Sequence, residues 1–226
     1  MQLIDHGIWT VPGDLTYAGL CLNTRMTVCR LSDGGLALIS PVSFSETRKA
    51  AIDAVGPVRM VISPNLLHHL FVGDWADAYP DAQSYGPPGL AAKRPDLSLS
   101  GELGPAFDAE CDDALWRLSI AGMPRLNESL FMHRPSGTLI ATDFCFHLPD
   151  ARGFTRAFAW LMGIIKRTRC EPLFRVLIKD KKAFRDSLAP LRSIEIHHLS
   201  MCHHSVLSEG ADAALSGVLD QLKVEG

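Results

Sequence analysis

The segment Val58-Arg59-Met60-Val61-Ile62-Ser63-Pro64-Asn65-Leu66-Leu67-His68-His69 contains the most informative transition in the chain. Val58–Ile62 is rich in β-branched and apolar residues, which is typical of a buried strand. Residues 66–79 have apolar side chains at helical spacing, and the two adjacent histidines lie where the strand gives way to this run. In α/β folds, ligands bind at the carboxyl ends of the strands. The segment therefore predicts a strand-to-helix junction with a candidate site at His68 and His69.

The rest of the chain predicts two series of strands, each followed by helices. In the first series, Ser32-Asp33-Gly34-Gly35 joins the strands at 26–31 and 36–40, because glycine accepts the positive φ of a hairpin turn. In the second, Arg134-Pro135-Ser136-Gly137 joins the strands at 128–133 and 138–143. Further strands are expected at residues 7–11, 82–85, 115–120 and 194–199, and further helices at 43–55, 151–166, 179–188 and 209–222. This order predicts an α/β fold with two sheets packed face to face and helices outside.

Composition limits the number of domains and the kinds of partner. The chain has 226 residues, 47% of them hydrophobic, and a net charge of −3, so one domain over residues 1–226 is expected. Lysine and arginine are scattered along the chain, and a nucleic-acid partner is not expected. The six cysteines form no CxxC pair, and no basic region followed by an apolar run stands at Met1. We therefore expect a protein of the reducing cytoplasm.

The longest apolar run, residues 157–165, is too short for the ~20 residues that a bilayer span requires. Its apolar side chains point almost all the way round a helix, which predicts a helix buried in the core or in a subunit interface. A homodimer is therefore one expected state. A helix on a membrane surface, flanked by Lys166, Arg167 and Arg169, is the alternative, although a membrane partner is not the favoured prediction.

Polar side chains that can bind metal follow three apolar strands. They are His68 and His69, then Asp143, and finally His203 and His204. Imidazole and carboxylate together are the usual ligand set for zinc, iron or manganese. A site with an open coordination position can activate water near neutral pH. The blander interpretation is a polar pocket without metal, in which Asp143 is hydrogen-bonded to a histidine.

The same elements resemble the metallo-β-lactamase superfamily, which has a four-layer αβ/βα sandwich fold and consists mainly of metal-dependent hydrolases. Residues 64–71 are similar to an uncharacterised bacterial branch of it in which the metal motif is eroded. The HxHxDH signature of the superfamily falls on Pro64 and Leu66 for its first two histidines, on His68 for its aspartate and on His69 for its last histidine. Proline and leucine cannot bind metal, so the resemblance implies that most of the first metal site is lost.

The remaining ligand positions of the superfamily also have counterparts in this chain. The segment of the third histidine falls near Asn127, the bridging aspartate matches Asp143, and the final histidine matches His203. The resemblance therefore implies at most one Zn or Fe ion, with His68, His69, Asp143 and His203 as ligands and Asp143 also as the catalytic residue. Cys202 is interpreted as a buried, inert thiol.

Two functions follow from the resemblance, and the sequence leaves open whether the protein is an enzyme. The first is a hydrolase that uses one metal-bound water on a small ester, amide or lactone. The alternative is a non-catalytic descendant that binds a small molecule or a protein partner through the same cleft. Loss of the ligands at Pro64 and Leu66 favours the alternative, while retention of Asp143 and His203 favours the hydrolase.

Overall fold

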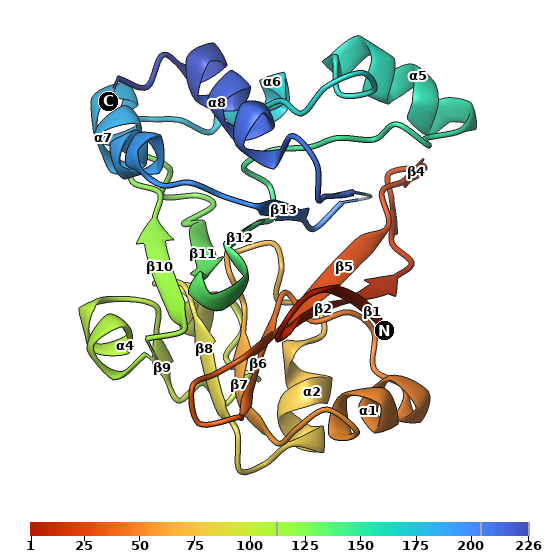
Figure 1. Cartoon of the computed structure of the whole chain (residues 1–226), viewed down its shortest axis with the longest axis vertical. Coiled ribbons are helices and arrows are strands. Elements are labelled where there is room, and N and C mark those ends of the chain that lie inside the picture. The colour runs from red at the N-terminus through yellow and green to blue at the C-terminus, as the bar shows by residue number, and fades with distance from the viewer. Residues whose placement is uncertain (112, 204, 226) are drawn as a thin grey trace.

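The computed structural model describes residues 1–111, 113–203 and 205–225. Two β-sheets lie at its centre (Figure 1). The first sheet has seven strands in the order β1-β2-β5-β6-β7-β8-β9. These strands are β1 (Gln2–Asp5), β2 (Ile8–Gly13), β5 (Thr24–Arg30), β6 (Leu36–Ile39), β7 (Val58–Ile62), β8 (Gln83–Gly86) and β9 (Gly101–Glu102). Pairing is antiparallel from β1 to β6 and parallel from β6 to β9, so the sheet is mixed.

The second sheet has five strands in the order β10-β11-β12-β13-β14. They are β10 (Leu115–Ser119), β11 (Ser129–His133), β12 (Thr138–Ala141), β13 (His198–Met201) and β14 (Val206–Leu207). Only the β12–β13 pair is parallel among these described strands. A separate small hairpin is formed by β3 (Thr16–Tyr17) and β4 (Leu20–Cys21).

Helices cover the outer faces of both sheets (Figure 1). The helices that alternate with or follow the strands of the first sheet are α1 (Glu46–Asp53), α2 (Val72–Ala78), α3 (Leu90–Lys93) and α4 (Pro105–Glu110). The second carries α5 (Gly153–Met162), α6 (Pro172–Val176), α7 (Lys181–Leu188) and α8 (Ala211–Leu222), with short 3₁₀ helices at Arg134–Ser136 and Ala189–Ser193.

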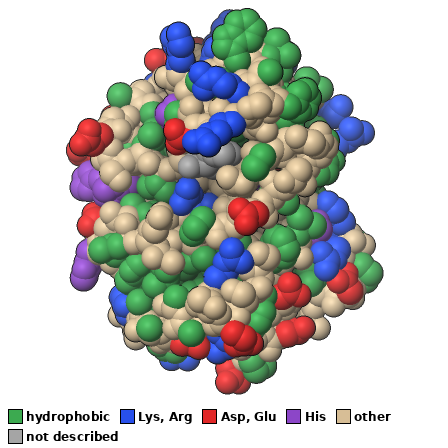
Figure 2. Space-filling view, turned by 90° about the vertical axis from the view of Figure 1, so that its right-hand side faces the viewer, with side chains coloured by type: hydrophobic (Ala, Val, Ile, Leu, Met, Phe, Trp, Pro, Cys, Tyr) green, Lys and Arg blue, Asp and Glu red, His purple; other side chains and the backbone are tan. Residues whose placement is uncertain are grey.

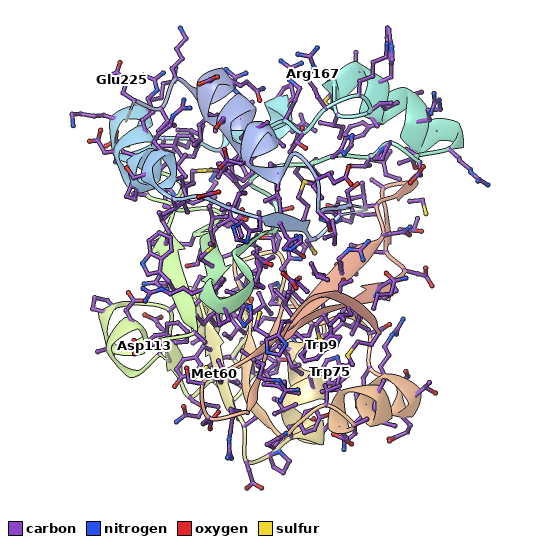
Figure 3. All side chains as sticks on the ribbon, viewed as in Figure 1. Trp9, Met60, Trp75, Asp113, Arg167 and Glu225 are labelled. Atoms are coloured by element: carbon purple, nitrogen blue, oxygen red, sulfur yellow. The ribbon has the colours of Figure 1, made fainter. Side chains whose placement is uncertain are left out.

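Three apolar layers hold the sandwich together. Between the sheets, Ile39 and Ile62 of the first sheet share a cluster with Phe131 of the second. Alternate residues of the same strands, such as Leu38, face the other way and pack with Trp75 under α1 and α2, on the side where Figure 3 labels Trp9 and Trp75. A third cluster joins the second sheet to α7 and α8. The predicted α/β fold of four layers, with two mixed sheets and helices outside, is confirmed.

The apolar run at 157–165 does not form the core helix that its composition predicts. Helix α5 ends at Met162, because Gly163 takes a left-handed conformation (φ 75°). Only Thr155 and Ala159 of the helix are buried, while Phe154 and Trp160 are exposed. The reason is its position, since α5 covers a small satellite cluster around Phe146 and Leu148 and not the main core. None of the helices in the described part of the chain has the length and apolarity needed to cross a membrane.

The strand predicted at 194–199 lies further along the chain, at His198–Met201. The preceding residues are taken up by the 3₁₀ helix Ala189–Ser193 and a bend. Pairing with β12 begins only where Thr138 meets His198, after the carbonyl of Gly137 has accepted hydrogen bonds from the amides of His197 and His198. This shift matters for the site because it sets where β13 ends.

Candidate metal centre

Asp143 and His203 are brought together by the one parallel pair described in the second sheet. Ala141 at the end of β12 pairs with Met201 at the end of β13. Asp143 and His203 each follow two residues later, so they leave the sheet at the same edge. The distance from His203 Nε2 to Asp143 Oδ1 is 3.6 Å, and both side chains are largely buried.

His68 reaches the same carboxylate from the first sheet. It lies in the segment between β7 and α2, and its Nε2 is 3.4 Å from Asp143 Oδ2. The helix predicted from residue 66 does not begin there, because Asn65 Oδ1 accepts the amides of Leu67 and His68 at 2.8 Å each. Such a side-chain-to-backbone turn competes with helix formation, and α2 begins only at Val72. The turn is therefore what aims His68 at Asp143.

Asn65 also fixes the carboxylate itself. Its Nδ2 donates to Asp143 Oδ2 at 2.8 Å and to Thr142 Oγ1 at 3.0 Å, and the side chain is fully buried. One side chain thus sets both the turn that carries His68 and the orientation of Asp143. Sequence reasoning missed this role, although an asparagine directly before a bend is a recognisable signal for such a turn.

The hydrogen bonds of the histidines leave the Nε2 atoms of both rings facing Asp143. His203 Nδ1 lies 2.7 Å from the carbonyl oxygen of Asn23, which can only accept, so Nδ1 carries the proton. In neutral His203 the lone pair is then on Nε2, the atom that faces Asp143. His68 Nδ1 contacts Ser40 Oγ at 2.9 Å and Cys202 Sγ at 3.3 Å, both of which can donate or accept, and its Nε2 faces Asp143. Metal-binding histidines usually have their other ring nitrogen bound in this manner.

The pKa values of His68, His203 and Asp143 are all shifted by their mutual contacts. Burial opposes protonation of His68, but the negative charges of Cys202 and Asp143 outweigh it and raise the pKa of His68 well above its ordinary value. Burial also opposes protonation of His203, but Cys202 and Asp143 outweigh it and raise the pKa of His203. The pKa of Asp143 is strongly lowered: burial would raise it, but both imidazoles stabilise the carboxylate. The three groups therefore need a shared positive charge, which either protons or a metal ion can supply.

Two of the three ligand separations in the set of His68, Asp143 and His203 are compatible with a single divalent ion. Zinc binds nitrogen and oxygen at about 2.0–2.1 Å, so two ligands of a tetrahedral site lie about 3.3–3.4 Å apart. The two contacts of the Asp143 carboxylate with imidazole, 3.4 and 3.6 Å, are close to this separation. Two imidazoles and one carboxylate with open positions also suit iron(II).

Cys202 is a second candidate for the third ligand, and the sequence did not assign it this role. The ligand atoms of His68, Cys202 and His203 lie within 4.8 Å of one another. Cys202 Sγ contacts His68 Nδ1 at 3.3 Å and Ser40 Oγ at 3.3 Å. Burial opposes ionisation of this thiol, but His68 and His203 outweigh it and lower its pKa to about 6. The described contact of His203 Nε2 is with Asp143 Oδ1, at 3.6 Å, and we therefore favour the set of His68, Asp143 and His203.

His69, the other predicted ligand at the junction, has a different partner. Its Nδ1 lies 3.0 Å from Arg94 Nη1, and since arginine only donates, Nδ1 accepts. Burial and the charges of Lys93 and Arg94 lower the pKa of His69. Adjacent residues of a turn point in different directions, so His68 and His69 do not share Asp143 in the described contacts. His204, which the sequence grouped with His203, lies outside the described residues.

A buried glutamate, which the sequence did not single out, shapes the loop around Asp143. Glu128 Oε1 accepts hydrogen bonds from Thr142 N (2.9 Å), Thr142 Oγ1 (2.6 Å) and Phe144 N (3.2 Å). Its other oxygen, Oε2, is buried without a hydrogen-bond partner among the described residues. Burial, reinforced by the charge of Asp143, raises the pKa of Glu128 to about 7. Asn127, where the resemblance places the third histidine, instead donates to the carbonyl of Pro88.

The raised pKa of Glu128 predicts a pH-dependent stability. The folded protein holds a proton on Glu128 at pH values where the unfolded chain has lost it, so this group makes stability fall as the pH rises from about 4.5 to about 7. We expect Glu128→Gln, which stays neutral, to be more stable than the wild type at pH 8 by on the order of 2 kcal/mol. At pH 4.5 the two should be similar. Urea unfolding of metal-free protein at both pH values measures this, and an equal difference at both would contradict it.

A cavity of about 340 Å³ opens beside the centre, and His68, Asp143 and His203 form part of its lining. The rest of the lining is mostly apolar, with Lys93 adding a positive charge. The apolar members are Leu15, Tyr17, Leu22, Pro41, Leu67, Leu70 and Phe71. A ligand in this cavity would therefore meet polar groups at one end and hydrocarbon over most of its surface.

These features define a class: an α/β sandwich whose polar site lies where the strands of its two sheets end. Among solved structures, a metallo-β-lactamase from Pontibacter korlensis matches with a TM-score of 0.65 and 13% identity over 99% of this chain and 98% of its own. The metallo-β-lactamase FIM-1 from Pseudomonas aeruginosa matches with a TM-score of 0.61 and 9% identity over 99% and 96%. VMB-1 matches with a TM-score of 0.68 and 9% identity over 98% and 95%.

The chain therefore has the metallo-β-lactamase fold, and the predicted resemblance to that superfamily is confirmed at the level of the fold. Residues 5–100 match the model of a family described as a domain of unknown function (DUF4336). No curated protein sequence matches the chain. Identities of 9–13% to the solved structures establish the fold alone.

Proposed function

We propose that the protein is a hydrolase that binds one Zn or Fe ion through His68, Asp143 and His203 and cleaves a small ester, amide or lactone. The observation that carries the proposal is the convergence of two imidazole Nε2 atoms on one buried carboxylate. In neutral His203, whose Nδ1 carries the proton, Nε2 directs a lone pair at a negative charge, an arrangement that a cation makes favourable.

The residues around the ligands hold them in place before any substrate arrives. Asn23 fixes the ring of His203, Ser40 contacts His68, and Asn65 binds Asp143. A divalent ion held there supplies Lewis acidity and lowers the pKa of water toward neutrality. Such outer hydrogen bonds typically change metal affinity by 10–100-fold when they are removed. Asp143 is the proposed catalytic residue because it lies at the boundary between the ligands and the cavity.

One ion, and not two, is proposed. Pro64 and Leu66 provide no ligand atoms, and the described contact of His69 is with Arg94. A two-metal clamp needs ligands on both sides of the shared nucleophile. The mainly apolar cavity favours a small substrate with an uncharged hydrocarbon part, and Lys93 provides a place for one negative charge.

Elemental analysis of protein purified without an affinity tag tests the proposal, together with hydrolysis assays on p-nitrophenyl esters and simple lactones. We expect about one Zn or Fe per chain and measurable hydrolysis. His69→Ala is the matched variant, and because of its contact with Arg94 we expect it to keep the metal. A protein that stays metal-free after zinc or iron is supplied would end the hydrolase proposal in this form.

A metal-free binding protein is the second candidate, and one observation favours it. If His68 and His203 are protonated, both form ion pairs with Asp143, so the group is satisfied without metal. The cavity could then bind a small molecule without chemistry. This candidate predicts ligand-induced stabilisation without turnover. With either function, we place the protein in the reducing cytoplasm, a placement supported by the six free cysteines.

A further inference from the structure

Lysine and arginine, expected to be scattered along the chain, are in fact concentrated in one segment of it. Residues 151–182 contain nine lysines or arginines but only two acidic residues, a net charge of +7 in a chain whose net charge is −3. The rest of the chain therefore carries −10. From residue 151 to residue 170 there is no acidic residue at all, while five are basic. A positive region of this kind on an acidic protein attracts an anionic partner.

The same region exposes large hydrophobic side chains. On α5, Phe154, Trp160 and Leu161 are 68%, 73% and 70% exposed, and on α6 Leu173 and Val176 are 57% and 74% exposed. Both helices lie at the same end of the molecule (Figure 1), where Figure 2 shows hydrophobic and basic side chains close together. We call this surface, made by 152–176, the α5–α6 face. Five large apolar side chains exposed on one face indicate an interaction surface.

The α5–α6 face is anchored to the hairpin at the mouth of the cavity. The backbone amide of Cys21, in β4, donates to Thr155 Oγ1 of α5 at 2.9 Å. Tyr17, on the partner strand β3, is 71% exposed and lines the cavity. Apolar exposure thus continues from α5 toward the mouth of the proposed active site.

The α5–α6 face presents both basic and apolar side chains, and this combination favours one of three classes of partner: a second copy of the chain, nucleic acid or a lipid bilayer. In a symmetric dimer the two faces would meet with like charges of +5 each over residues 152–176, which opposes association. Nucleic acid would pair with the basic groups and stack on Trp160, but it would leave the aliphatic Leu161 and Val176 without favourable contacts. An anionic bilayer satisfies both kinds of group, because lysine and arginine reach the headgroups while tryptophan and leucine enter the interface.

We propose that the α5–α6 face docks the protein on an anionic lipid bilayer. Phe154, Trp160 and Leu161 enter the interfacial region, and Arg156 and Arg167 contact lipid headgroups. Arg167 extends from the surface just beyond the end of α5 (Figure 3). The surface potential of an anionic membrane attracts such basic residues in a salt-dependent way. The sequence kept a membrane-surface helix as the alternative to a core or interface helix, and the structure favours this alternative because α5 exposes Phe154, Trp160 and Leu161.

Flotation with large unilamellar vesicles tests the proposal, using phosphatidylcholine alone and phosphatidylcholine with 30% phosphatidylglycerol. We expect the wild type to bind the anionic vesicles at least about 10-fold more tightly than the neutral ones, and 0.5 M NaCl to weaken binding. The double variant Trp160→Ser/Leu161→Ser and the variant Arg156→Glu should each lose about 10-fold or more. Both change exposed side chains, and circular dichroism checks that they remain folded.

Matched controls change similar side chains elsewhere. Leu3→Ser alters a 65% exposed leucine on β1, and Arg59→Glu alters an exposed arginine on β7, and both should bind vesicles like the wild type. The proposal is overturned if wild-type protein stays with the unbound fraction on anionic vesicles, or if Trp160→Ser/Leu161→Ser binds as well as the wild type. Binding of labelled single-stranded RNA or concentration-dependent dimerisation, without vesicle binding, would overturn it in favour of those partners.

Discussion

Asp143→Ala is expected to lose the bound metal and to reduce hydrolysis to background. Asp143 is the group that His68 Nε2 and His203 Nε2 both face, at 3.4 and 3.6 Å. Without it, two imidazoles remain, which is fewer than the three protein ligands of catalytic zinc sites. Because loss of an outer hydrogen bond alone costs 10–100-fold in affinity, loss of this ligand should cost more than about 100-fold. Elemental analysis and competition with a zinc chelator dye measure the change.

Cys202→Ser separates the two ligand sets that the structure allows. Since His203 Nε2 contacts Asp143 Oδ1 at 3.6 Å, we expect Cys202→Ser to keep its metal and most of its activity. If Cys202→Ser loses the metal while Asp143→Ala keeps it, the ligand set is His68, Cys202 and His203 instead. If neither variant changes the metal content, the ion is bound elsewhere and the proposed centre is wrong. Asn65→Ala should lie between the wild type and Asp143→Ala, because it removes the hydrogen bond to Asp143 but no ligand.

Much of the fold could be predicted because its signals are local. The hairpin at Gly34 depends on a left-handed backbone conformation that glycine adopts readily, whereas the same conformation at Gly163 ends α5 inside the helix predicted for 151–166. All four residues of β6 are apolar, the pattern of a strand buried on both faces, and the structure places Leu38 and Ile39 in different apolar layers. Asp143 and His203 could be selected because the ends of neighbouring parallel strands meet.

The directions of single side chains could not be predicted, because contacts between distant segments set them. His68 turns toward Asp143 and His69 toward Arg94 as a result of a turn whose Asn65 is held by Thr142, 77 residues away. The role of Glu128 depends equally on contacts with the loop after β12. The apolar run of α5 has the composition of a core helix, and only its position over a minor cluster leaves Trp160 exposed.

Gly122→Ala is expected to destabilise the fold more than other substitutions of positive-φ glycines. Gly122 has a φ of 75°, and a Cβ there would lie 2.2 Å from the carbonyl oxygen of Asp180 and 3.1 Å from the amide nitrogen of Phe184. These are backbone atoms at the start of α7, which cannot move aside like a flexible side chain. Left-handed conformation costs an alanine roughly 1–2 kcal/mol, and forced overpacking adds roughly 1–3 kcal/mol. We therefore expect a loss of about 3 kcal/mol, or roughly 6–12 °C in Tm.

Gly34→Ala is the control that isolates the conformational cost. Gly34 has a φ of 84°, and a Cβ at this position meets no atom within 4 Å, so only the left-handed penalty of about 1 kcal/mol applies. Urea unfolding of both variants gives the difference. The contact between Gly122 and the start of α7 holds this helix in place. The carbonyl of Gly122 accepts hydrogen bonds from the amides of Lys179 and Asp180, and Phe184 of α7 is buried in the core cluster under the second sheet. Equal losses in the two variants would show that α7 can shift away from Gly122 at little cost, so that this junction does not fix the helix against the second sheet.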